Sequence, residues 1–111
     1  MSDEAVDVET VVLKTLLQHK ELYQELHLCD VRAEKFVTAR GGEKAVMVFY
    51  LMSDDIEASV GGLTAFYSRT ATKRMELRQV VASALATAGW DGPVYGRFRL
   101  ISEDAENEEQ P

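Results

Sequence analysis

The most apolar run of the chain is Lys44–Met52, and both of its faces are apolar. As an extended strand, this run places two sets of side chains on opposite faces: Val46, Val48, Tyr50 and Met52 on one, and Ala45, Met47, Phe49 and Leu51 on the other. A strand that exposes one face to water alternates apolar with polar residues. Because this run does not, it predicts the central strand of a sheet.

The residues before this run begin with a predicted helix over 7–26. Apolar residues recur there every three to four positions, which is the spacing of a helix with one buried face, and His19 falls on that stripe. Asp7 can cap the first turn, because its carboxylate can accept a hydrogen bond from a free backbone N–H.

A strand is predicted from about Val31 to Arg40, and its charged residues suit a position near the sheet edge. Gly41-Gly42 separates it from the central strand. Two glycines between extended runs predict a two-residue hairpin loop with Arg40 opposite Glu43, since such a turn needs positive φ at both central positions.

The residues after the central strand predict a polar turn or one turn of helix over 53–57, then three further elements. Residues 59–68 are predicted to be extended, with either a bulge at Gly61-Gly62 or a late start of the strand at Leu63, and with a usable strand at 63–67. A second helix begins at Thr70 or Thr72 and ends at 88, before Gly89. The last strand covers 94–101.

The fold class that follows is α+β: two layers in the order α-β-β-β-α-β, with a mostly antiparallel sheet and two helices on one face. A single domain over 7–101 is expected, with a frayed acidic N-terminus at 1–6 and a disordered acidic tail at 102–111. The second apolar face of the central strand then needs a long loop, strong sheet curvature or a partner chain to cover it. A homodimer is therefore an expectation.

The 111 residues contain one cysteine, which cannot form an internal disulfide. The N-terminus has no basic and apolar leader, and no segment reaches the length of a membrane span. These features predict a cytoplasmic protein that does not enter a membrane.

The net charge of −7 is unevenly distributed. Residues 1–30 carry seven acids and two bases, and residues 100–111 carry five acids and no base, whereas residues 69–99 carry two acids and six bases. An acidic whole argues against general affinity for nucleic acid. The basic block keeps a nucleic-acid-binding module as the alternative function, because aromatic and arginine side chains together can stack bases. The candidate patch is Tyr67, Arg69, Lys73, Arg74, Arg78, Tyr95, Arg97 and Arg99.

No catalytic or metal-binding pattern is found. His19, His27 and Cys29 provide three metal ligands at most, without CxxC or HxxxH spacing. Cys29 is interpreted as a small buried apolar group and an inert thiol. The carboxylate pair Asp54-Asp55 lies in a solvated turn, and neither Gly-Gly pair has a phosphate-loop context. We expect no enzyme activity, no metal and no cofactor.

The sequence therefore favours a non-catalytic small acidic protein-binding protein: an adaptor, a chaperone, or an inhibitor of the immunity type. An acidic surface steers association with a basic partner. The candidate contacts are Glu21, Glu25, Asp30, Asp54, Asp55 and Glu57. In element order the chain is similar to the small acidic chaperones of bacterial secretion systems, which are compact α/β homodimers; the likeness is one of layout alone.

Overall fold

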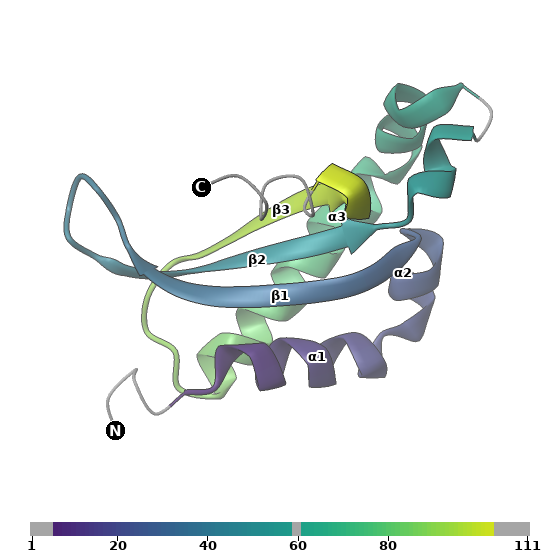
Figure 1. The fold of residues 1–111 in the computed structure, drawn as a ribbon. Helices are drawn as coiled ribbons and strands as arrows, with labels where there is room; N and C mark the ends of the chain where they lie inside the picture. The colour runs from purple at the N-terminus through teal and green to yellow at the C-terminus, as the bar shows by residue number, and fades with distance from the viewer. Residues whose placement is uncertain (1–5, 59–60, 104–111) are drawn as a thin grey trace.

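Strand β2, Lys44–Met52, is the central strand of a three-stranded sheet with the order β1-β2-β3, as its two apolar faces predict (Figure 1). The structure is a computed structural model, and it describes residues 6–58 and 61–103. The predicted frayed residues 1–5 and residues 104–111 of the predicted tail lie outside this part of the chain. The other elements are α1 (Val8–Gln18), α2 (Lys20–Glu25), β1 (Leu28–Val37), the 3-10 helix η2 (Asp54–Ala58), α3 (Gly62–Thr87) and β3 (Val94–Leu100).

The sheet is mixed. β1 pairs antiparallel with β2 in the longer of the two ladders, and β3 pairs parallel with β2 on the other side. The parallel strand follows from α3, which carries the chain back along the sheet before β3 begins. Figure 1 shows α1 and the length of α3 that crosses the sheet on the same side of it. The predicted α+β class, with helices packed on one face of the sheet, is confirmed.

The hydrophobic core lies between this helical layer and one face of the sheet. Val46, Val48, Tyr50 and Met52 of β2 are each at most 1% exposed. They pack in one cluster with apolar residues of α1 and α3, among them Val12, Leu16, Leu77, Val81 and Leu85. Burial of this face of β2 is the main stabilising contribution, because the hydrophobic effect scales with the apolar area removed from water.

The opposite face of the sheet, which we call the open face, has no such layer among the described residues. The strand register places these side chains on it: Asp30, Arg32, Glu34 and Phe36 from β1, Ala45, Met47, Phe49 and Leu51 from β2, and Tyr95, Arg97 and Arg99 from β3. The flanking strands cover part of β2 with their own long side chains. The guanidinium carbons of Arg32 and Arg99 lie 5.1 and 4.5 Å from the centre of the Phe49 ring.

The predicted strand at 63–67 is wrong, because these residues form the first turns of α3. The buried residues Phe66, Thr70, Leu77, Val81 and Leu85 continue one helical stripe back to the start of α3. Gly61 is the N-cap of α3 and Gly62 is its first residue, so the two glycines, with φ values of +84° and +70°, form the entry to a helix and not a bulge in a strand. The element order that is similar to the small acidic secretion chaperones contained this strand, so the observed order differs from it.

The hairpin register is also different from the prediction. Val37 pairs with Lys44, and the backbone N–H of Thr38 donates to the carbonyl of Glu43 over 2.9 Å, so Arg40 does not face Glu43. The loop is longer than two residues, and β1 ends at Val37 rather than at Arg40. The register differs by two residues, and an even shift leaves every side chain on its predicted face.

The predicted helix over 7–26 is interrupted at His19. The imidazole Nδ1 of His19 lies 3.0 Å from the carbonyl oxygen of Thr15, the group that an unbroken helix would pair with the His19 backbone N–H. That N–H bonds instead to the carbonyl of Leu16. α1 therefore ends at Gln18, and α2 begins at Lys20.

The predicted cap at Asp7 is confirmed and gives a pH prediction. The Asp7 carboxylate accepts hydrogen bonds from the hydroxyl and the backbone N–H of Thr10, which lower the pKa of Asp7. A carboxyl whose folded pKa is depressed stabilises the fold above its unfolded pKa of about 3.9, and this is lost as pH falls through the folded pKa.

Asp7→Ala should therefore lower the free energy of unfolding at neutral pH, and the difference from wild type should shrink in acid. Urea unfolding at a series of pH values measures this. Glu9→Ala, in the same helical turn, is the control. A difference that stays constant down to the lowest pH would show that the Asp7 charge does not stabilise α1.

Candidate functional site

Five of the eight residues predicted as a basic patch line one groove between α3 and the edge strand β3. They are Tyr67, Arg74, Arg78, Arg97 and Arg99. The groove has a volume of about 520 Å³, and Gly96, Phe98 and Glu103 complete its lining. We call it the arginine groove.

Two arginines of α3 are held in place by aromatic rings and hydrogen bonds. Arg74 donates from Nη2 to the carbonyl of Tyr67 over 2.7 Å and from Nε to the hydroxyl of Thr70 over 3.3 Å. Its guanidinium carbon lies 4.9 Å from the centre of the Tyr67 ring, and that of Arg78 lies 5.1 Å from the centre of the Phe98 ring. Contacts of this kind restrict the rotamers of an arginine and orient its remaining donors.

The wall of the groove depends on Gly96 and Tyr67. A Cβ at Gly96 would lie 2.9 Å from the Tyr50 ring and 3.3 Å from Cγ of Arg78, so glycine leaves the space in which Arg78 crosses the edge strand. The Tyr67 hydroxyl donates to the carbonyl of Phe98 over 3.5 Å. Burial, and then the Glu103 charge, raise the pKa of Tyr67, whose phenol is a neutral donor at physiological pH in any case.

The other three residues of the predicted patch lie elsewhere. Lys73 forms an ion pair with Glu25 of α2, Tyr95 is on the open face, and Arg69 is exposed on α3 outside the lining of the groove. Because α3 begins at Gly62, Lys73 and Arg74 lie near the middle of the helix and not in its first turns.

The predicted acidic contacts gather at one end of the sheet, which we call the acidic end. α2 leads into the first residues of β1, and η2 follows the last residue of β2, which pairs with them. The predicted contacts Glu21 and Glu25 lie on α2, Asp30 lies near the start of β1, and Asp54, Asp55 and Glu57 lie on η2. Elements far apart in sequence thus meet at one end of the sheet, and the sequence alone did not place them together.

Some of these carboxylates already have partners within the fold. Asp54 accepts from the hydroxyl of Ser102 over 2.9 Å, and Asp30 accepts from the backbone N–H of Val31 over 2.8 Å. Glu25 is the partner of Lys73. These contacts hold the carboxylates in place at the molecular surface.

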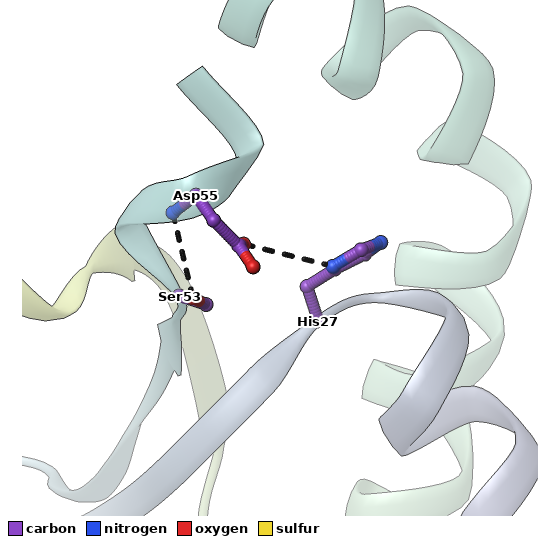
Figure 2. Close-up of polar contacts among 3 residues, drawn as sticks. All are labelled: His27, Ser53 and Asp55. Atoms are coloured by element: carbon purple, nitrogen blue, oxygen red, sulfur yellow. Dashed lines mark hydrogen bonds and ion pairs between the residues drawn. The ribbon is translucent and has the colours of Figure 1, made fainter. Parts of the chain in front are cut away.

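Figure 2 shows His27, Ser53 and Asp55 at this end of the sheet. The imidazole Nδ1 of His27 lies 3.8 Å from a carboxylate oxygen of Asp55, and the Ser53 hydroxyl accepts from the backbone N–H of Asp55 over 3.4 Å. A nucleophilic triad requires the hydroxyl to bond to the imidazole. Here the backbone N–H of Ser53 donates to the carbonyl of His27 over 2.8 Å, so the three residues join η2 to the start of β1.

Cys29 is exposed, which corrects its interpretation as a buried apolar group. It lies on β1 at the register shift between Leu28 and Asp30. Its neighbour Leu28 is buried in the core, and successive side chains of a strand point to opposite faces, so Cys29 points away from the core.

Within residues 6–58 and 61–103 no three histidine, cysteine, aspartate or glutamate side chains are arranged to hold a metal ion. A search of the same residues finds no helix with the length and apolar character of a membrane span.

Comparisons of the chain with protein-family models, with curated proteins and with solved structures find no match.

The candidate site residues predicted from the sequence did not include Arg32, Phe36, Phe49 and Phe98. Phe98 stacks on Tyr50 with ring centres 4.5 Å apart and also supports the arginines of the groove. The sequence did contain a signal for Phe49. This residue lies on the second apolar face of β2, and no predicted element covers that face.

Proposed function

We propose that the chain is a non-catalytic protein-binding protein, of the adaptor, chaperone or inhibitor kind, and that the open face is its main contact surface. The observation that carries the proposal is that one face of the sheet presents partly exposed apolar and arginine side chains, with no layer from the described residues packed on it. Met47, Phe49 and Phe36 are half-buried and Tyr95 is 46% exposed, whereas Ala45 and Leu51 on the same face are 0% and 3% exposed. Aromatic residues, methionine and arginine are the types enriched at protein interfaces.

A protein partner suits this face better than single-stranded nucleic acid does. Base stacking needs free ring faces. Two guanidinium groups already lie over the Phe49 ring, and Phe36 and Tyr95 contact each other with ring centres 6.1 Å apart. The net charge of −7 also opposes a polyanion.

The occupant that we propose for the open face is a second copy of the chain. At one edge of this face β1 contributes Asp30, Arg32 and Glu34, and at the other β3 contributes Arg97 and Arg99. A two-fold axis parallel to the strands would place β1 of each copy opposite β3 of the other while the two β2 strands face each other. Asp30 would then be level with Arg99 of the second copy, an attractive pair, and Arg32 would be level with Arg97. The β1 edge is net negative and the β3 edge is positive, so the two edges attract each other overall in a homodimer.

The acidic end is a second contact surface, directed at a positively charged protein. Asp30 belongs to both surfaces, but α2 and η2 lie outside the sheet, so a dimer would still present two acidic ends. A cytoplasmic location belongs to the same proposal, because Cys29 is a free and exposed thiol, as is usual in a reducing compartment.

Met47→Glu tests the proposal. It introduces a charge at the centre of the open face, and we expect the dimerisation constant to weaken by about tenfold or more because the charge would be buried without a partner. Sedimentation equilibrium measures the constant, and circular dichroism checks that the variant is folded.

Met75→Glu is the matched control: Met75 is 58% exposed on α3, and the same substitution there should leave the dimer intact. A wild-type chain that is monomeric at every accessible concentration would overturn the homodimer. An equal effect of both substitutions would show that the open face is not the interface.

A further inference from the structure

The arginine groove concentrates positive charge in one place on an acidic protein. Four arginines line it, and Glu103 is the one carboxylate among its described lining residues. We propose that the groove binds the phosphate group of a small phosphorylated ligand. Arg97 and Arg99 also belong to the open face, where the guanidinium carbon of Arg99 lies 4.5 Å from the centre of the Phe49 ring, so the inference rests on Arg74 and Arg78 of α3 and goes beyond the protein-binding role.

Two like charges lie close together on α3 beside the groove. Arg74 and Arg78 are four residues apart on α3, and like charges at that spacing destabilise a helix. Their guanidinium carbons lie 5.8 and 5.1 Å from the centre of the same Phe98 ring. A bound anion between the two cations would offset their repulsion.

A phosphate group matches the charge and the donors of the groove. A phosphate monoester carries close to two negative charges on one group and offers three acceptor oxygens. Planar guanidinium groups bind such oxygens in pairs, and more than one arginine can share a single phosphate. Arg74 is already fixed by its bonds to Tyr67 and Thr70, so its remaining donors are oriented in advance.

The size and lining of the arginine groove suit a small phosphorylated compound better than a long single strand. The groove is shallow and open to solvent, with a volume of about 520 Å³, so it can hold a phosphate group without enclosing the rest of the ligand. A longer single strand would need stacking surfaces, but the ring centres of Tyr67 and Phe98 each lie within 5.1 Å of a guanidinium carbon. A compact phosphorylated compound needs only the phosphate contacts.

Glu103 gives the proposal a second test, of opposite sign. Its carboxylate lines the groove, close enough to Tyr67 for its charge to act on the phenol. A negative charge there repels a phosphate. Neutralising Glu103 should therefore strengthen binding, whereas neutralising the arginines should weaken it.

The experiment is isothermal titration of the full chain with ribose 5-phosphate, with unphosphorylated ribose as the neutral probe. Wild type should bind ribose 5-phosphate and not ribose. Arg78→Gln, at an exposed position, and the double variant Arg74→Gln with Arg78→Gln should each weaken binding by about tenfold or more. Glu103→Gln should tighten it several-fold, and affinity should fall below pH ~6, where the phosphate gains a proton.

Lys73→Gln is the matched control, since Lys73 is on the same helix but pairs with Glu25 outside the groove. Absence of ribose 5-phosphate binding by wild type would overturn the proposal, as would an equal loss in the Lys73 variant. If the wild-type chain binds oligothymidylate more tightly than ribose 5-phosphate, with a steep dependence on salt, the groove is a nucleic-acid site and the phosphate-ligand proposal is overturned. Loss of binding in the Arg78 variant with an unchanged circular dichroism spectrum would support it.

Discussion

Leu77→Ala should lower the free energy of unfolding by about 2–5 kcal/mol, the range for removing a large aliphatic side chain from a packed core. Leu77 is fully buried, on the stripe of α3 that packs on the sheet. Truncation would remove contacts with the core and leave a cavity that its neighbours can only partly fill. Domains of this size have about 5–15 kcal/mol of stability in total, so this one substitution would remove a large share of it.

Urea unfolding followed by circular dichroism measures the change, with the m value used to check that the transition stays two-state. Leu17→Ala is the matched control, because Leu17 is 68% exposed on α1. It should change stability by less than about 0.5 kcal/mol. Equal losses in the two variants would mean that α3 does not contribute the centre of the core.

Gly92→Ala should destabilise the fold by about 1–3 kcal/mol, as overpacking does where the neighbouring atoms cannot move. Gly92 lies in the turn that joins α3 to β3. A Cβ there would overlap the carbonyl oxygen of Lys44, a backbone atom of β2, and would lie 3.2 Å from the buried Trp90 ring. The turn is also fixed to β2, because the carbonyl of Pro93 accepts from the backbone N–H of Val46 over 3.0 Å.

Gly41→Ala, in the hairpin loop, separates this steric effect from the general cost of replacing glycine. A Cβ at Gly41 would have its nearest neighbour at 3.9 Å, an ordinary contact, and its φ is not positive. Its stability should stay within about 1 kcal/mol of wild type. A Gly92 variant as stable as the Gly41 variant would show that the turn can move away from β2.

The candidate sites were predictable in their residue types and only partly in their grouping. The alternation in Val94–Leu100 predicts Tyr95, Arg97 and Arg99 on one face of a strand, and the strand register confirms it. Lys73 and Arg74 are adjacent in sequence, yet one pairs with Glu25 of α2 and the other lies in the arginine groove. Neighbouring residues on a helix point in different directions, so proximity in sequence could not assign both to one surface.

The prediction of a strand at 63–67 failed for a related reason. Short apolar runs with glycines suit a strand or a helix entry equally well, and the periodicity of five residues does not separate the two. Phe66 lies one helical turn before Thr70, and its side chain is buried in the hydrophobic core. This packing with residues distant in sequence favours the helix.

What the sequence by itself determined is the central strand, its two apolar faces, the capped first helix and the uneven charge. Each of these depends on the spacing of residues that are close together in the sequence. Only the tertiary structure decided that β3 lies parallel to β2, that arginines of two elements meet in one groove, and that carboxylates of three elements share one end. These depend on how α3 crosses the sheet, and that path is set by the packing of the whole core rather than by any one segment.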